Sequence, residues 1–179
     1  MKATGIVRRI DDLGRVVIPK EIRRTMRIRE GDPLEIYTTK EGEVIFKKYS
    51  LLGGLEDFAA QFCDTLSRST DFITAITDRD SIIAVAGAPK RELLGKTISE
   101  PLEERMEQRQ VWCWEQGQRS IPACSGVEGY FAAVAAPILC AGDVLGLVLF
   151  LAAEGVAAGE TEQKLAQTVA AFLGRNMEN

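Results

Sequence analysis

The stretch from Tyr130 to Ala153 constrains the fold more than any other part of the chain. It is 24 residues long and almost entirely apolar, so it must be buried in a membrane or in a protein core. Pro137 and Asp143 interrupt it, and an aspartate at the centre of a bilayer costs about 3 kcal/mol. The sequence therefore predicts two buried strands and no membrane span. The expected strands are Tyr130–Cys140 and Val144–Ala152, joined by a turn at Ala141-Gly142-Asp143.

Charge is distributed unevenly along the chain. Of its 179 residues, 22 are basic and 26 are acidic, which gives a net charge of −4. Residues 1–29 nonetheless hold 9 basic and 3 acidic side chains, whereas residues 51–179 hold 10 basic and 18 acidic ones. A basic head on an acidic body indicates two modules, of which the head meets a polyanion. A solvated charged surface without a partner is the alternative.

Several kinds of chemistry are excluded by composition. The chain has no histidine, which removes imidazole bases and most zinc and iron sites. Its four cysteines form no CxxC pair, and the first residues, MKATGIVRR, lack the pattern of a secretory leader. We therefore expect a cytoplasmic protein with free thiols, no catalytic residue, no cofactor and no metal site. The cysteines are Cys63, Cys113, Cys124 and Cys140.

The head has the pattern of two strands, a short helix and two further strands. It carries few large apolar side chains, and a domain of about fifty residues is marginally stable at best. Two copies could bury what one cannot, so we expect an obligate dimer with interleaved strands. The expected elements are strands Thr4–Ile10 and Arg15–Ile18, a helix over Lys20–Met26, and strands Leu34–Tyr37 and Val44–Phe46.

Residues 5–19 (GIVRRIDDLGRVVIP) and 21–24 (EIRR) resemble the DNA-binding domain of AbrB-type transition-state regulators. The resemblance implies a swapped-hairpin β-barrel dimer that binds double-stranded DNA at loosely defined sequences. Guanidinium groups suit this partner because their planar fork of donors matches phosphate oxygens and guanine edges. Ion pairs of Arg23 and Arg24 with Glu21 or Glu30 are the structural alternative. The family's DNA-contacting arginines correspond to Arg8, Arg15, Arg23 and Arg24, with Arg9 as a further candidate.

The body begins after residues 51–54, where Gly53-Gly54 forms a candidate hinge. Apolar spacing predicts amphipathic helices over residues 55–69 and 160–177. Between them we expect strands over 71–78 and 81–87, helices over 90–94 and 101–114, and the buried strand pair. This order, with Ala136-Pro137-Ile138 and the run from Gly142 to Val148, resembles a GAF domain, a PAS-like antiparallel sheet used as a small-molecule sensor.

The whole chain resembles a family of sporulation regulators that join an AbrB-like head to a GAF-like body. It implies an α+β protein that controls genes expressed late in sporulation, in the forespore, and acts on the nucleoid. The domains would be residues 1–50 for DNA binding and 55–179 for ligand sensing and assembly. The family implies a tetramer in which the helices flanking the GAF-like unit join two DNA-binding dimers.

Two other functions remain open from the sequence. A GAF-type thiol enzyme, similar to methionine sulfoxide reductases, would need a thiolate of low pKa near a resolving cysteine, which Cys113 and Cys124 could supply. A swapped-hairpin antitoxin would use the head to bind a protein, but its toxin-wrapping tail would be low in apolar residues. The body's ligand is unknown. Trp112 and Trp114 either line its pocket, between the sheet and the helices of residues 90–118, or belong to the core or an interface.

Overall fold

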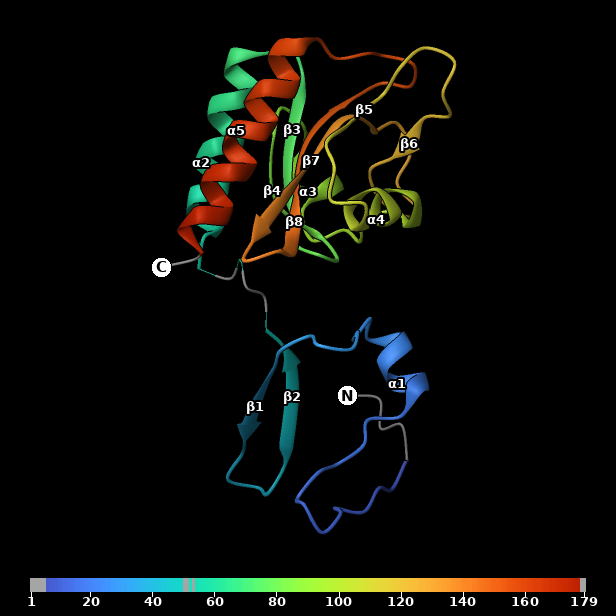
Figure 1. The fold of residues 1–179 in the computed structure, drawn as a ribbon, viewed down its shortest axis with the longest axis vertical. Coiled ribbons are helices and arrows are strands. Elements are labelled where there is room, and N and C mark those ends of the chain that lie inside the picture. The colour runs from blue at the N-terminus through green and yellow to red at the C-terminus, as the bar shows by residue number, and fades with distance from the viewer. Residues whose placement is uncertain (1–5, 50–51, 53, 178–179) are drawn as a thin grey trace. The chain divides into compact units, whose positions relative to one another are not determined.

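The computed structural model describes residues 6–49, 52 and 54–177. The chain divides into two compact units, Met1–Tyr49 and Ser50–Asn179, which correspond to the head and the body (Figure 1). Both units contain helices and antiparallel strands, as the α+β expectation requires. In the described part of the chain, no helix combines the length and the apolar character needed to cross a bilayer.

The head contains one short helix and one β-hairpin. Helix α1 spans Lys20–Thr25, and strands β1 (Leu34–Thr38) and β2 (Val44–Lys48) pair antiparallel. The register places Glu35 opposite Lys47, so a carboxylate and an ammonium group face each other across the hairpin. These three elements confirm the second half of the head pattern.

The two strands expected before α1 are wrong for the single chain. Residues 6–10 and 15–18 belong to no strand, and the first two residues of the expected Thr4–Ile10 strand lie outside the described residues. A strand requires a neighbour that accepts and donates its ladder hydrogen bonds. Among residues 6–18 the single chain supplies only local contacts, such as Asp11 N–H to Arg15 O at 3.0 Å.

The body is built on one antiparallel sheet with the strand order β4-β3-β8-β7-β5, and β6 pairs with β7. The central hairpin of β7 and β8 confirms the buried strand pair predicted from the apolar run. Ala141 (φ 48°) and Gly142 (φ 90°) are both left-handed, which is the backbone of a tight hairpin turn. The strands are β3 (Ile73–Thr77), β4 (Ile82–Ala86), β5 (Trp112–Cys113), β6 (Ile121–Pro122), β7 (Phe131–Cys140) and β8 (Asp143–Ala152).

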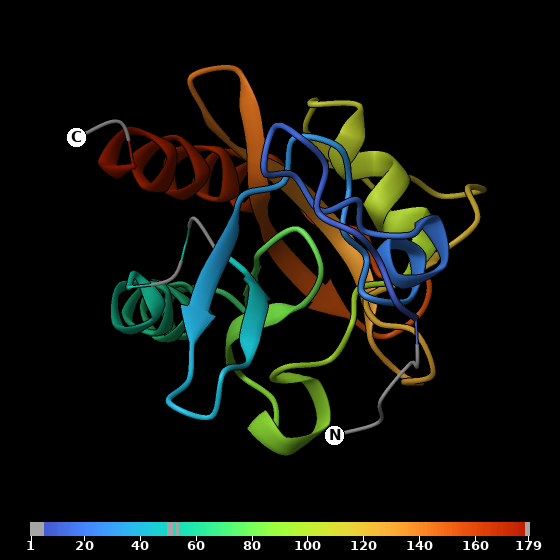
Figure 2. The ribbon, with the colours of Figure 1, turned by 90° about the horizontal axis from the view of Figure 1, so that it is seen from below.

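Helices cover both faces of this sheet. Figure 2 shows α2 (Glu56–Ser69) and α5 (Glu160–Asn176) on one side of β7 and β8, and α4 (Glu100–Glu107) on the other. The short helix α3 spans Lys90–Leu93 and packs with β4. This is the GAF-like antiparallel sheet flanked by helices that the sequence predicts.

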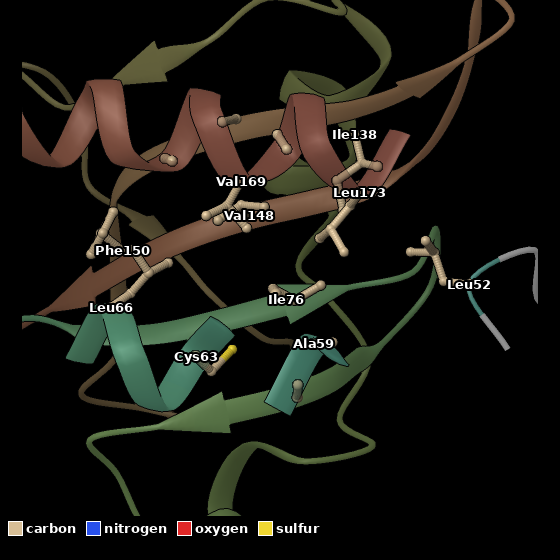
Figure 3. Close-up of a cluster of buried hydrophobic side chains, with 14 of the residues drawn as sticks. Leu52, Ala59, Cys63, Leu66, Ile76, Ile138, Val148, Phe150, Val169 and Leu173 are labelled. Atoms are coloured by element: carbon tan, nitrogen blue, oxygen red, sulfur yellow. The ribbon is translucent and has the colours of Figure 1, made fainter. Parts of the chain in front are cut away.

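Each face of the sheet has its own buried core. Figure 3 shows the first cluster, in which Leu66 of α2 lies beside Phe150 of β8 and Leu173 of α5 lies beside Ile138 of β7. The second cluster joins Leu93 and Met106 to the opposite face. Leu52 is 1% exposed and belongs to the first cluster, so this residue of the expected hinge is packed into the body.

Gly146 lies where β8 passes closest to β3. A Cβ atom added there would lie 1.9 Å from the Thr77 carbonyl oxygen. No larger residue fits this position without displacement of the backbone. The glycine that contributed to the GAF resemblance therefore has a packing role.

The helix expected over residues 101–114 is only partly right. Helix α4 ends at Glu107, and Arg109 then takes a left-handed backbone (φ 56°). Trp112 and Cys113 form β5 instead, opposite Ala135 and Val134 of β7. Pairing with the edge of the sheet prevails here over the helical propensity of the segment.

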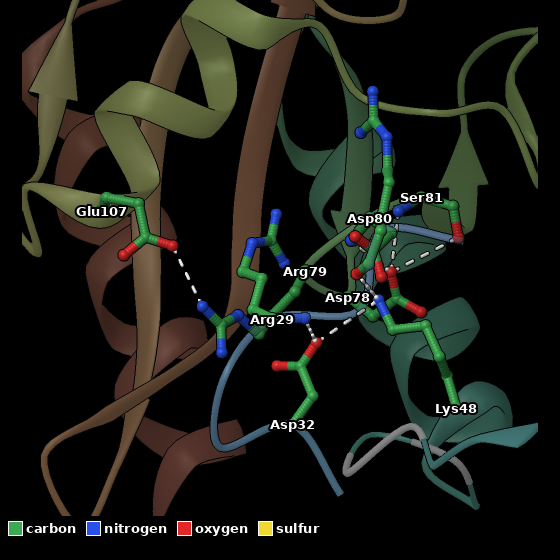
Figure 4. A network of polar contacts seen from close by, with 9 residues as sticks. Arg29, Asp32, Lys48, Asp78, Arg79, Asp80, Ser81 and Glu107 are labelled. Atoms are coloured by element: carbon green, nitrogen blue, oxygen red, sulfur yellow. Dashed lines mark hydrogen bonds and ion pairs between the residues drawn. The ribbon is translucent and has the colours of Figure 1, made fainter. Parts of the chain in front are cut away.

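The turn between β3 and β4 is held by one carboxylate. Asp78 Oδ1 accepts hydrogen bonds from the N–H groups of Asp80 at 2.8 Å and Ser81 at 2.7 Å (Figure 4). Arg79 in the same turn reaches α4, where its Nη2 atom lies 3.0 Å from Glu107 Oε1. The polar turn predicted from the sequence thus connects the sheet to α4.

Candidate nucleic-acid interface

The loop that presents Arg15 is organised by Asp11. Its Oδ1 atom accepts the N–H of Leu13 at 3.0 Å and the N–H of Arg15 at 2.8 Å. Its Oδ2 atom accepts Arg15 Nε at 2.8 Å. Gly14 supplies the left-handed residue of the turn with φ 76°. The short polar side chain thus fixes the backbone of the loop and one edge of the guanidinium.

These contacts also act on the Asp11 carboxylate. The backbone N–H of Arg15, and next its side chain, lower the pKa of Asp11 below its ordinary value. Because the pKa of Asp11 is lowered in the folded state, its contacts with Arg15 stabilise the loop fully at pH values above the ordinary pKa of an aspartate. The contribution is lost as the pH falls through the lowered value, so the loop is intact at neutral pH.

Helix α1 carries Arg23 and Arg24 in its last turn. Pro19 precedes the helix, where its missing N–H costs nothing, and Met26 caps its end. Arg27 then adopts φ 51°, and the Ile28 N–H returns to the Arg23 carbonyl at 2.7 Å. This hydrogen bond ends the helix after about two turns, and the chain then continues to β1.

A partly buried ion pair connects the end of α1 to the hairpin. Lys48 Nζ donates to the Arg27 carbonyl oxygen at 2.7 Å and lies 3.8 Å from Asp32 Oδ2. Asp32 Oδ2 also accepts the Arg29 N–H at 2.8 Å, and the Asp32 side chain is only 5% exposed (Figure 4). The ammonium group therefore stabilises the C-terminal end of α1 from 21 residues further along the chain.

The predicted DNA-binding arginines are placed on three segments of the head. Arg8 and Arg9 lie in the extended segment before the loop, Arg15 closes the loop, and Arg23 and Arg24 belong to α1. Arg23 is half-buried, while the other four are exposed. Neither Arg23 nor Arg24 forms an ion pair with Glu21 or Glu30 in the described part of the chain, so the structural alternative for these residues has no support.

The head also exposes most of its apolar side chains. Among residues 6–49, Pro19 is the sole buried residue, and none belongs to a buried hydrophobic cluster. Val7 is 90% exposed, and Ile10 and Val17 are each 68% exposed. Native domains do not leave their apolar residues uncovered in this way. The exposed set is Ile6, Val7, Ile10, Leu13, Val16, Val17, Met26, Ile36, Tyr37, Val44 and Tyr49.

The cysteines of the body do not form a thiol centre. Burial raises the pKa of Cys63 to about 12 and that of Cys124 to about 11, and it raises the pKa of Cys113 as well. A nucleophilic thiol requires the opposite shift. Cys113 packs against the first core cluster, whereas Cys124 belongs to the second. The sheet therefore separates these two thiols.

The two tryptophans belong to the packed body. Trp114 is buried, and its Nε1 donates to the Gln118 carbonyl oxygen at 3.1 Å. Trp112 packs against the second core cluster with the Arg105 guanidinium 5.6 Å from its ring centre. Of the two interpretations left open by the sequence, the core interpretation is the one that these contacts support.

Comparisons with known proteins define the class of the chain. A family model described as stage V sporulation protein T C-terminal, transcription factor, matches residues 54–178. A second model, described as antidote-toxin recognition MazE, bacterial antitoxin, matches residues 7–50. The body is therefore that of a transcription factor, in agreement with the expectation that the chain is not an enzyme.

Individual relatives refine this class. Stage V sporulation protein T of Bacillus subtilis (strain 168) is 50% identical over 179 residues, which cover 99% of each chain. The transition state regulatory protein AbrB of the same organism is 63% identical over 49 residues, 27% of this chain and 50% of AbrB. The chain belongs to the stage V sporulation protein T family.

One solved structure illustrates the fold of the body. The type II free methionine-R-sulfoxide reductase from Thermoplasma acidophilum superposes with a TM-score of 0.52 at 10% identity. The match covers 69% of this chain and 94% of the reductase. At this identity the likeness shows the fold alone.

Loss of the Lys48 contact should weaken the head as a unit. We predict that Lys48→Met destabilises the head by about 1–3 kcal/mol, because it leaves the Arg27 carbonyl and the buried Asp32 carboxylate without their ammonium partner. DNA affinity should fall with it, because α1 carries Arg23 and Arg24. Thermal unfolding and fluorescence anisotropy measure the two effects.

Lys47→Met is the matched control, because it removes the same charge from the neighbouring strand position. Lys47 is exposed, and its Nζ atom lies 4.8 Å from the Tyr37 ring centre, a contact worth about 0.5–1 kcal/mol. Equal losses in the two variants would show that the charge matters and the Lys48 contact does not.

Proposed function

We propose that the protein is a sequence-tolerant, DNA-binding transcriptional regulator of late, forespore sporulation genes, located on the nucleoid in the cytoplasm. Residues 1–50 form the DNA-binding domain, residues 51–54 the link, and residues 55–179 the sensing and assembly domain. The observation that carries the proposal is a head with exposed arginines and no core of its own. Membership of the stage V sporulation protein T family and the 63% identity to AbrB support it.

The DNA surface consists of arginines from two heads. Arg8, Arg15, Arg23 and Arg24 contact DNA, and Arg9 adds a further positive charge. Arg8, Arg9, Arg15 and Arg24 are exposed, and Arg23 and Arg24 have no acidic partner in the described part of the chain. These guanidinium groups are therefore available to phosphate oxygens. Arg15 is restrained by Asp11 on its Nε edge, and its side chain remains 68% exposed.

The head functions as an interleaved homodimer. The apolar side chains around residues 6–18 and on the hairpin need a cover, and a second copy presents the same apolar set. Exchange of these segments would also give residues 6–10 and 15–18 the strand partners that the single chain lacks. The same two-fold arrangement doubles the number of arginines that face the duplex.

The body assembles two head dimers into a tetramer through α2 and α5. Phe62 of α2 and Phe172 of α5 meet edge to face with ring centres 5.2 Å apart, so the two helices lie side by side. Phe58 is 52% exposed and Phe172 is 46% exposed, which leaves aromatic surface on the outer side of both helices. A tetramer raises DNA affinity because the second head dimer binds at high effective concentration.

The antitoxin-like interpretation has one observation in its favour, the match of residues 7–50 to the MazE model. In that case the head would bind a protein. No observation favours the thiol-enzyme interpretation, because burial raises the pKa of three of the four thiols.

The DNA proposal is tested by the salt dependence of binding. For about 8 phosphate contacts, log K should fall against log salt with a slope of about −7. Arg15→Ala should weaken binding and reduce the slope by about one unit for each head in contact with DNA. Fluorescence anisotropy on a labelled AT-rich duplex between about 50 and 300 mM salt measures both quantities.

Lys40→Ala serves as the control, because it removes one exposed charge from the tip of the β1–β2 hairpin. If the slope of log K against log salt were equal for Lys40→Ala and Arg15→Ala, the loss of binding would come from net charge and not from the position of Arg15. A full chain that does not bind the duplex would refute the proposal and favour a protein partner for the head.

The assembly proposal is tested at Phe172. Phe172→Glu should convert the tetramer to a dimer, because a carboxylate would be placed in the apolar contact between helices. Gln116→Glu, at an exposed position outside α2 and α5, adds the same charge and should leave the mass unchanged. Light scattering gives the mass, and a tetramer in Phe172→Glu would remove α5 from the interface.

A further inference from the structure

A hollow of about 350 Å³ lies on the α5 side of the sheet. It is lined by β7, by α5, and by the segment that leads from α4 to β5. The sequence suggested a pocket between the sheet and the helices of residues 90–118. The hollow is instead lined by α5 and by residues 109 and 111, which follow α4. Its volume is at the lower end of the range for small-molecule sites.

The hollow exists because α5 carries small residues where it crosses β7. A Cβ atom at Gly174 would lie 2.0 Å from the Leu139 carbonyl oxygen, so the helix backbone lies directly against the strand. One turn earlier, Ala170 and Ala171 have side chains too short to fill the space beside this contact. Together with Val111 and Pro137 they form apolar walls.

Two guanidinium groups line the same hollow, from Arg109 and Arg175. Within the part of the chain that the structure describes, neither has a hydrogen-bond or ion-pair partner. None of the lining residues is acidic, although residues 51–179 hold 18 acidic side chains against 10 basic ones. The hollow is thus a cationic site on an acidic body.

Arg109 has a further unusual property. It is one of three non-glycine residues with a left-handed backbone in the described part of the chain, at φ 56°. Such a conformation costs free energy for a residue with a side chain. Here it follows the C-cap of α4 and ends the helix, as Arg27 does after α1. Here it occurs at the residue that brings one of the two positive charges to the hollow.

We propose that this hollow binds a small organic acid. The carboxylate is held by Arg109 and Arg175, with Gln167 on the same rim, and the apolar part of the acid lies against Val111, Pro137 and the two alanines. The two arginines attract a negative charge, and the apolar wall favours a hydrocarbon chain. Together they select an organic acid over a simple inorganic anion. The inference rests on the proposed sensing role of the body and gives it a site and a ligand class.

The test uses the full chain and three probes: hexanoate, hexanamide and inorganic phosphate. Isothermal titration should show binding of hexanoate, at least tenfold weaker binding of hexanamide, which lacks the charge, and at least tenfold weaker binding of phosphate, which lacks the hydrocarbon. Arg175→Gln should weaken hexanoate binding about tenfold through loss of a charged hydrogen bond. Ala171→Phe should abolish it by filling the hollow from an exposed position of α5.

Arg119→Gln is the matched control, because Arg119 is an exposed arginine of the body that does not line the hollow. It should bind hexanoate as the original chain does. Absence of hexanoate binding, equal binding of hexanamide, or equal loss in Arg119→Gln and Arg175→Gln would each overturn the proposal. DNA binding of the same variants without hexanoate is measured in parallel, so that failure of the DNA proposal is seen separately.

Discussion

Burial of apolar surface is the interaction that the head cannot achieve within one chain, and its other properties depend on how that burial is completed. A helix of two turns and a two-stranded hairpin enclose no buried hydrophobic cluster among residues 6–49. Local polar contacts shape the segments, through Asp11 in the loop and Lys48 at the end of α1. Such contacts define geometry but supply little net free energy in water. The apolar surface must supply the rest, and in the function proposed above a second copy of the head covers it.

The body solves the same problem within one chain. Its central hairpin, β7 and β8, is long enough to carry a core on each face, and helices close both cores. This gives a stable platform whose outer helices, α2 and α5, keep exposed aromatic rings. One protein therefore combines a head without a buried hydrophobic cluster among residues 6–49 with a body that has two such clusters and keeps exposed aromatic rings. In the proposed function, assembly through the body increases the DNA affinity of the heads.

Much of the body could be predicted from sequence, because its signals are local. The apolar run from Tyr130 to Ala153 predicts the central hairpin, and the spacing of apolar residues predicts α2 and α5 to within about one residue. The segment after Glu107 could not be predicted correctly, since Trp112 and Cys113 form a strand only by pairing with the edge of β7. The hollow beside α5 was not foreseeable for a similar reason. It results from the approach of Gly174 to Leu139, two residues 35 positions apart.

The head shows a different limit. Its arginines are evident from composition and from the AbrB resemblance, but the Lys48 contact joins residues 21 positions apart and has no sequence signature. The expected strands before α1 illustrate the same point, because their hydrogen-bond partners cannot lie in the segment itself.

Hydrogen exchange of residues 6–10 and 15–18 tests the central claim most directly. If a second copy completes the head, the backbone N–H groups of these residues are protected in the full chain at micromolar concentration, and the protection is lost on dilution below the dimer dissociation constant. Exchange at the rate of an unstructured peptide at every concentration would contradict the account.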